Sequence, residues 1–286
     1  MSNSPVLVVT GFDAHHFDLA QDLADSFRHA YQDRYRLVAI VFGAEAPSPQ
    51  LAARFDQIAH ITDDTSSFDT SRGYFLAYAG LKAKLRDVFP GHSAYCWIDA
   101  DCWFQGNESL PRICAGLTAF DLCVHPEADV HYRDHDTPSA RTLQIYRAND
   151  GARLAAMPLS KPMLNAGVFA MRADSPAWSL WEAELTQLRQ RHQRGEPVYF
   201  SDQIPLHKVA HLNRLRLYPL RAIDNWQTYA CLPFIDRQAR CLRVPTVPHE
   251  KIGLMHLAGS TKDQTFSIDG QPTTLRYRDM VRLFAR

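Results

Sequence analysis

The sequence predicts a mixed α/β protein whose mainly parallel central sheet is flanked by helices. Near-continuous apolar runs alternate with amphipathic stretches over the first hundred residues, which is typical of parallel strands covered on both faces. The 286 residues include 46% hydrophobic ones, enough for a sizeable core. No repeat or linker marks a boundary, so we expect one domain over residues 1–273 and a basic amphipathic segment over residues 274–286.

The first elements can be read in order along the chain. The run "PVLVVTGFD" over residues 5–13 predicts a strand, and "HHFDLAQDLADSFRHAY" after it has apolar residues at helical spacing. A second strand is expected in "YRLVAIVFG", residues 35–43. "SPQLAARFDQIAHI" predicts a helix, because Ser48 can cap it and Pro49 suits its first position.

The later elements include the strand that leads to the most informative motif. "YFLAYAGLKAKLRDVFPG" predicts an amphipathic helix, and the apolar run "AYCWI" follows it. Further elements are expected at these positions: a helix over 108–117, strands over 120–126 and 163–172, and a long helix over 175–195. In parallel sheets of this kind, ligands bind outside the carboxyl ends of the strands.

Two aspartates one residue apart, Asp99 and Asp101, end that apolar run. Carboxylates are rarely buried unless they are paired or bind a metal, although this short pattern also occurs in turns and helix caps. Oxygen ligands suit Mg²⁺ or Mn²⁺, which in turn bind phosphates. Thr10 and Asp13, after the first strand, would face the same crevice.

A second motif lies in "GLMHLAGSTKD" near the C-terminus. His256 could be a third metal ligand, since imidazole binds Mn²⁺ acceptably. Gly259 would let the backbone approach a phosphate closely, and Lys262 would supply a positive charge. A lone histidine followed by a lysine is also common in purely structural settings, so the two motifs gain weight only together.

The ordered set of motifs resembles a known family. The Asp-x-Asp is followed by "LNAGVF", by a "DQ" that opens a helix in "YFSDQIPL", and by H-x-x-G-x-x-K. This order, from about Val6 to Lys262, resembles the retaining nucleotide-sugar glycosyltransferases of family 8, most closely the bacterial galactosyl- and glucosyltransferases that build lipopolysaccharide cores. The resemblance implies a GT-A fold, which is Rossmann-like and binds nucleotides.

The resemblance also implies a role for each matching residue. The ligands of Mn²⁺ (or Mg²⁺) would be Asp99, Asp101 and His256. The UDP-sugar donor would be bound by Thr10 and Asp13 at the nucleoside, by Asn165 and Ala166 at the sugar, and by Gly259 and Lys262 at the diphosphate. The reacting face would hold Asp202 and Gln203; the family's Gln has been proposed to stabilise the cationic sugar or to act as nucleophile.

Some positions depart from the family pattern. The arginine usually found in a segment like Y-A-R-L is Gly80 here, with Lys82 and Lys84 nearby, and Lys82 is our candidate for the donor contact. The usual Lys-Pro-Trp is replaced after Lys262, and the acid that often follows Asp-Gln is Ile204. These changes point to a different sugar, a different nucleotide or reduced activity.

Composition limits the partners and the location. Lysine plus arginine equals aspartate plus glutamate, at 31 each, so no overall positive field favours nucleic acid. The six cysteines form no C-x-x-C pair and no signal peptide is evident, so we expect a cytoplasmic protein. The basic amphipathic end could hold it peripherally against the inner face of the cell membrane.

The motifs predict a metal-dependent enzyme, and the resemblance implies that it moves a hexose, galactose or glucose, from a UDP-sugar to a saccharide or glycolipid acceptor with retention of configuration. Three alternatives stay open at this point. They are a sugar-nucleotide-binding pseudoenzyme, a nucleotidyltransferase, and a phosphatase of the haloacid dehalogenase type, which also uses an Asp-x-Asp after a strand.

Overall fold

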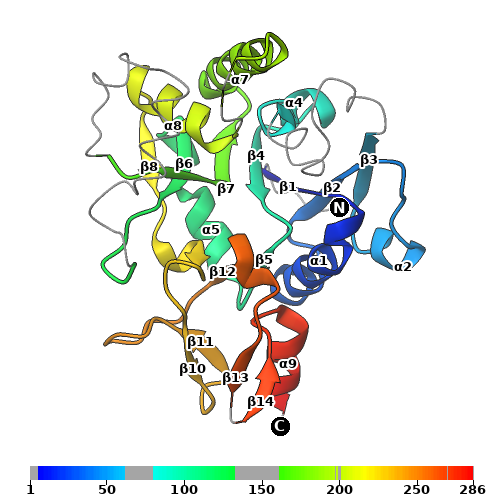
Figure 1. Ribbon diagram of the computed structural model, residues 1–286, viewed down its shortest axis with the longest axis vertical. Helices are drawn as coiled ribbons and strands as arrows, with labels where there is room; N and C mark the ends of the chain where they lie inside the picture. The colour runs from blue at the N-terminus through cyan, green and yellow to red at the C-terminus, as the bar shows by residue number, and fades with distance from the viewer. Residues whose placement is uncertain are drawn as a thin grey trace.

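The computed structural model describes residues 6–61, 80–132, 161–196, 198, 201–268 and 270–285. A seven-stranded sheet in the order β3-β2-β1-β4-β7-β6-β8 forms its centre (Figure 1). Its strands are β1 (Val6–Phe12), β2 (Arg36–Phe42), β3 (Gln57–Ile61), β4 (Ala94–Ile98), β6 (Leu122–Pro126), β7 (Leu164–Arg172) and β8 (Leu217–Pro219). β7 is antiparallel to both neighbours and the other pairings are parallel, so the sheet is mainly parallel as predicted.

Helices cover both faces of this sheet, because alternate residues of each strand face opposite ways. Val6 and Val8 of β1 join a core with helices α1 (Phe17–Tyr31) and α5 (Ser109–Cys114). Leu7 and Val9 join a second core with helices on the other face. Those helices are α4 (Leu85–Val88), α7 (Ala177–Gln193) and α8 (Gln203–Leu212).

A second, smaller sheet continues from the first. Its three strands, in the order β5-β12-β9, are β5 (Cys102–Phe104), β12 (Leu254–His256) and β9 (Trp226–Gln227). Trp103, Met255 and Trp226 from these strands join a third apolar core. Two hairpins lie in this part of the chain: β10 (Phe234–Asp236) with β11 (Cys241–Arg243), and β13 (Phe266–Ile268) with β14 (Gln271–Thr273).

Short helical turns complete the described elements and hold several of the residues discussed below. They are α2 (Pro49–Ala52) and the 3-10 turns η1 (Ala14–His16), η3 (Ala115–Thr118), η5 (Ala222–Asp224) and η6 (Gly259–Lys262). η1 follows β1 and η6 follows β12, so both lie just after strands whose ends approach the turn between β4 and β5.

The helix predicted from Ser48 onward is wrong beyond its first turn. Ser48 does cap α2, accepting a hydrogen bond from the Leu51 backbone, but the chain then forms β3 at the edge of the sheet. Asp56 accepts a hydrogen bond from the Leu37 backbone at 2.6 Å and fixes the entry to β3. Backbone pairing with β2 and burial of apolar side chains outweigh the helical pattern of this segment.

The C-terminal helix α9 (Tyr277–Ala285) packs against α1 at the lower end of the molecule (Figure 1). Its Met280 and Leu283 are buried in the third core. Arg278 pairs with Asp22 at 2.8 Å, so part of the basic face predicted from the sequence is occupied by acids of α1. In the ranges that the structure describes, no helix is both long and apolar enough to cross a membrane.

Candidate functional site

The two aspartates of the Asp-x-Asp lie in the turn that connects the two sheets. β4 ends at Ile98 and β5 begins at Cys102, so Asp99 extends the large sheet and Asp101 leads into the small one. The Cys102 amide donates to the Asp99 carbonyl at 3.0 Å, and the Asp99 amide donates to the Gly167 carbonyl at 2.8 Å. This tight turn holds both carboxylates at the carboxyl end of β4, where the sequence predicts a ligand site.

Asp99 is held by groups from the large sheet and its helices. Its Oδ1 lies 2.9 Å from Lys82 Nζ and accepts a hydrogen bond from Trp97 Nε1 at 2.6 Å. Burial raises the pKa of Asp99 above its ordinary value, an effect that Lys82 opposes. Lys82 Nζ also pairs with Asp202 at 2.7 Å, so one buried ammonium joins two of the predicted site residues.

The two carboxylates stabilise the charged form of Lys82. Burial by itself lowers the pKa of Lys82, but the charges of Asp202 and Asp99 outweigh that effect and raise it above the ordinary lysine value. Its ammonium also donates to the Ala166 carbonyl at 3.1 Å. A buried positive charge thus lies two residues after Gly80.

Asp101 has different neighbours, although it is only two residues away. Its Oδ1 lies 3.3 Å from His256 Nε2, and its Oδ2 lies 3.5 Å from Lys262 Nζ. Burial raises the pKa of Asp101, but His256 and Lys262 more than offset this and hold it well below its ordinary value. Within the described part of the chain, the buried Oδ1 takes part in no hydrogen bond.

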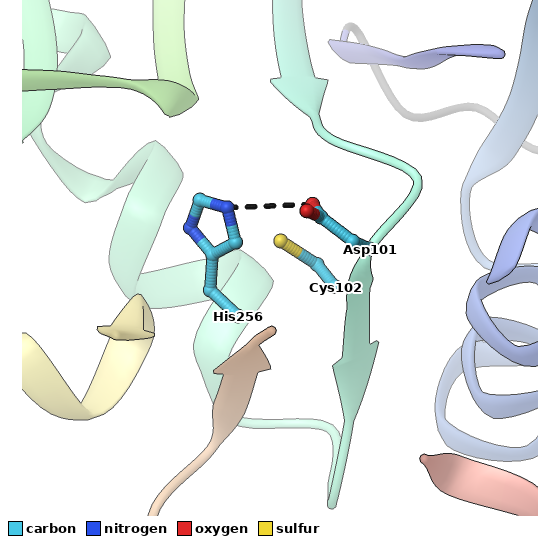
Figure 2. A group of neighbouring side chains, drawn as sticks. All are labelled: Asp101, Cys102 and His256. Atoms are coloured by element: carbon cyan, nitrogen blue, oxygen red, sulfur yellow. Dashed lines mark ion pairs between the residues drawn. The ribbon is translucent and has the colours of Figure 1, made fainter. Parts of the chain in front are cut away.

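Asp101, Cys102 and His256 form a group whose ligand atoms all lie within 4.8 Å of one another (Figure 2). Figure 2 shows the imidazole and the carboxylate facing each other, with the Cys102 sulfur beside them. Next to them, a Cβ on Gly167 would lie 2.5 Å from His256 Cε1 and 2.7 Å from Asp99 Oδ2. A glycine thus keeps the space between Asp99 and His256 free of a side chain, which together with the Asp101 carboxylate facing His256 fits a cation.

Hydrogen bonds determine which nitrogen of His256 faces this space. The Gly167 amide can only donate, and it donates to Asn165 Oδ1 at 3.0 Å, which makes that oxygen an acceptor. Asn225 Nδ2 donates to the same oxygen at 3.0 Å, so Asn225 presents its own oxygen to His256 Nδ1 at 2.8 Å. His256 must donate from Nδ1, which leaves Nε2 directed at Asp101, as in histidines that bind metals.

A glutamate that sequence reasoning missed continues this chain of contacts. Glu127 Oε1 accepts hydrogen bonds from Asn165 Nδ2 and from Gln203 Nε2, each at 2.9 Å. Burial raises the pKa of Glu127 above its ordinary value, against the effect of these two amides. Glu127 therefore links Asn165, predicted at the donor sugar, with Gln203, predicted at the reacting face.

Other predicted residues lie around this centre. Asp13 caps η1 and accepts from His16 Nδ1 at 2.6 Å; burial raises its pKa, but His16 outweighs the effect and the value is lowered. Thr10 is fully buried at the end of β1, and its hydroxyl has no hydrogen-bond partner among the described residues. Gly259 opens η6 with a positive φ of 66°, a conformation that glycine adopts without strain.

The structure thus connects most of the predicted residues through hydrogen bonds and ion pairs. Lys82 contacts Asp99, Asp202 and the Ala166 carbonyl. Asp101 contacts His256 and Lys262. Glu127 connects Asn165 with Gln203. Glu127 could have been predicted from the sequence, because it is the first acidic residue after the apolar run "LCV" of β6, just as Asp99 is the first after β4. Cys102 and Asn225 could not, because their places depend on pairing between distant strands.

Comparison with solved structures confirms the predicted fold. The chain superposes on mouse xyloside xylosyltransferase 1 with a TM-score of 0.53 at 14% sequence identity, covering 89% of this chain and 97% of that one. The galactosyltransferase LgtC, in complex with donor and acceptor sugar analogues, matches with a TM-score of 0.59 at 14% identity over 97% of this chain and 95% of that one. The bifunctional glycosyltransferase WbbM matches at 0.58 and 15% identity over 99% of this chain, which spans 50% of WbbM.

Sequence comparison contributes nothing further, because no family model and no curated protein matches this chain. The three-dimensional neighbours are glycosyltransferases of the type that the motifs resemble. The chain has their GT-A fold, a mixed α/β fold with a mainly parallel central sheet flanked by helices, as the sequence predicts.

Proposed function

We propose that this protein is a metal-dependent retaining glycosyltransferase that moves a hexose, galactose or glucose, from a UDP-sugar to a saccharide or glycolipid acceptor such as a lipopolysaccharide core. One observation supports this more than any other. In a GT-A fold, the buried Oδ1 of Asp101 has no hydrogen-bond partner among the described residues, and His256 Nε2 is directed at it. A carboxylate and an imidazole so arranged suit a divalent cation.

Mn²⁺ or Mg²⁺ would be held by Asp101, His256 and Asp99, with Cys102 close by. When bound, the ion would neutralise the charge that grows on the departing diphosphate. Lys262, about a quarter exposed and 3.5 Å from Asp101, is free to turn towards the same diphosphate. Lys82 orients Asp99 and Asp202 through its two ion pairs.

The transfer itself requires little from the protein beyond positioning. Gln203 would lie near the anomeric carbon with its amide held by Glu127, and Asn165 and Ala166 would line the sugar. A departing phosphate oxygen could take the proton of the acceptor hydroxyl, so that the acceptor enters from the same face and the configuration is retained. Retention is the part of the proposal that rests on the family resemblance alone.

Thermal unfolding with ligands tests the donor site. Mn²⁺ with UDP should raise the midpoint of the wild type, and a ligand present at 100 times its Kd adds about 2.7 kcal/mol to the free energy of unfolding. For a chain of this size that corresponds to a rise of roughly 5–10 °C. Asp101→Ala should lose the rise, and Asp174→Ala, which removes an exposed carboxylate far from the site, should keep it.

The other outcomes of this experiment separate the alternatives. A Mn²⁺-dependent rise with UDP and UDP-hexoses, but no transfer or hydrolysis of any donor, would indicate a sugar-nucleotide-binding pseudoenzyme. A response to nucleoside triphosphate with release of pyrophosphate would indicate a nucleotidyltransferase. No response to any nucleotide would make a phosphatase the better hypothesis and contradict the proposal.

We also propose a cytoplasmic location with a peripheral membrane contact through residues 274–286. Arg276 and Arg278 pair with Asp263, Asp18 and Asp22. Arg282 pairs with Asp279 at 3.4 Å but is about three-quarters exposed, so it and the half-exposed Val281 can meet a lipid surface. Co-sedimentation with anionic vesicles should weaken in Arg282→Ala. Equal binding of the variant and the wild type would contradict the membrane contact.

A further inference from the structure

Gln227 has a buried side chain whose amide no contact among the described residues explains. The residue is completely buried, yet among the described residues neither its amide oxygen nor its amide nitrogen has a hydrogen-bond partner. Buried amides are nearly always paired, because an unpaired one loses its bonds to water and gains nothing in return. A side chain with both halves unpaired therefore requires an explanation.

Strand register places this side chain on the same face as His256 and Cys102, which together with Asp101 form the candidate metal-binding group. His256 pairs with Cys102 of β5 on one side and with Gln227 of β9 on the other. Residues directly opposite each other in a sheet direct their side chains to the same face. The alternate residues Trp103, Met255 and Trp226 fill the third apolar core on the opposite face. Gln227 thus lies one strand away from His256, on the same face of the small sheet.

The backbone of Gln227 is firmly held, so a loose strand does not explain the unpaired amide. Its N–H donates to the Tyr132 hydroxyl at 3.2 Å. Its carbonyl accepts from the amides of Ala230 at 3.0 Å and Cys231 at 3.2 Å. The side chain is therefore presented from a fixed position, which favours binding because little freedom is lost when a ligand arrives.

The neighbouring amides are already occupied, which distinguishes Gln227 from them. Asn225 is bonded to His256 and Asn165, and Gln203 is bonded to Glu127. A primary amide offers two donor hydrogens and an acceptor oxygen, and adjacent hydroxyls of a sugar offer the same pair of functions. Among these amides, Gln227 is the one with both functions available to a hexose.

We propose that Gln227 is a substrate-binding residue whose amide forms paired hydrogen bonds with adjacent hydroxyls of a hexose bound beside the metal-binding group. This inference rests on the proposed glycosyltransferase function and extends it to a residue that helps to select the sugar. The hexose is either that of the donor or that of the acceptor, and the experiment below distinguishes them.

The test compares Gln227→Met, which keeps the shape of the side chain but removes both hydrogen-bonding functions, with Gln187→Met at an exposed position of α7. Thermal unfolding is measured for each protein alone, with Mn²⁺ and UDP, and with Mn²⁺ and UDP-glucose or UDP-galactose. KM and kcat for transfer are measured for donor and acceptor separately. We expect the Gln227→Met protein without ligands to be at least as stable as wild type, because an unpaired buried amide has been removed.

With ligands, we expect Gln227→Met to respond to Mn²⁺ and UDP as the wild type does. If the amide binds the donor hexose, the extra stabilisation by UDP-hexose over UDP disappears and kcat/KM falls about ten- to a hundredfold through the donor. If it binds the acceptor hexose, the donor response is kept and the loss appears in the KM of the acceptor. Gln187→Met should match the wild type throughout.

Two results would overturn the inference, and a third would remove its basis. Unchanged donor and acceptor constants in Gln227→Met would show that the amide does not bind sugar. A clear loss of stability in the variant without ligands would show that the amide serves the fold, through a buried water. If the wild type does not respond to Mn²⁺ and UDP at all, the proposed function is wrong and the inference loses its basis. If the wild type responds normally to UDP and Gln227→Met leaves the response to the hexose unchanged, only the inference about Gln227 is wrong.

Discussion

The two aspartates of one motif, Asp99 and Asp101, have opposite surroundings. Asp99 belongs to the large sheet, its Oδ1 is engaged by Lys82 and Trp97, and burial raises its pKa. Asp101 leads into the small sheet, where His256 and Lys262 lower its pKa and one oxygen has no hydrogen bond among the described residues. Two carboxylates of one short sequence motif can thus have quite different partners, and under the proposed function Asp101 rather than Asp99 is the principal ligand of the cation.

The largest expected effect comes from removing the charge of Asp101. Asp101→Asn should abolish the Mn²⁺-dependent rise in unfolding temperature and lower kcat/KM about a thousandfold, because metal charge stabilisation is worth several kcal/mol. Asp99→Asn should cost only about tenfold, since Asp99 is already engaged by Lys82. Steady-state kinetics of both variants measure the difference. Equal losses would mean that the two carboxylates bind the ion equally.

The next effect concerns the protein partner of Asp99. Lys82→Met removes the ammonium that joins Asp99 to Asp202 and leaves two neighbouring carboxylates unpaired, which should cost about 3 kcal/mol of stability. Added Mn²⁺ should restore part of that loss by replacing the positive charge. Denaturant unfolding with and without the ion measures both effects.

Lys84→Met serves as the control for this experiment, because Lys84 forms a surface pair with Glu182. Such pairs contribute about 1 kcal/mol or less. If Lys82→Met is as mild as its control, Asp99 is not held by Lys82 and the contrast between the two aspartates is wrong.

A smaller effect is expected from closing the space between the two sides. Gly167→Ala places a Cβ against His256 and Asp99, which should cost about 1–3 kcal/mol by overpacking and weaken Mn²⁺ binding about tenfold or more. Titration of Mn²⁺ by calorimetry gives the affinity. Gly80→Ala, whose Cβ would meet only the flexible end of Arg189, is the control. An unaltered Mn²⁺ affinity in Gly167→Ala would place the ion elsewhere.

The smallest effect is a pH dependence from His256. Burial lowers the pKa of His256, but Asp101 outweighs this and raises it above the ordinary value. A histidine whose pKa is raised in the folded state stabilises the fold fully when the pH is below the unfolded pKa of about 6.5. This stabilisation is lost as the pH rises through the pKa of the folded state. Metal binding needs the neutral ring, so the Mn²⁺-induced rise should instead grow over the same window.

Unfolding midpoints measured between pH 6 and pH 9, with and without Mn²⁺, check this prediction. His256→Gln should flatten the dependence in the protein without metal. A Mn²⁺ response that does not change over this range would show that the imidazole is not a ligand.

Much of the fold could be predicted because the apolar runs are strong and continuous. β1, β2, β4, β6 and β7 lie where the sequence predicts them, since strands buried on both faces must be apolar throughout. The sequence predicts a helix where β3 lies, because the short apolar run of Gln57–Ile61 carries no periodicity that separates a strand from a helix. Edge pairing with β2 decided its conformation.

The sequence by itself determined the residue types that the site needs and the order in which they come. Asp99, Asp101, His256 and Lys262 could be identified because charged groups next to apolar runs need a reason to be there. Only the tertiary structure decided which of them pair with one another and which pair with residues from elsewhere in the chain. Lys82, Glu127 and Gln227 acquire their significance from contacts between strands and helices far apart in the chain, and such pairing is set by the packing of the whole molecule rather than by local sequence.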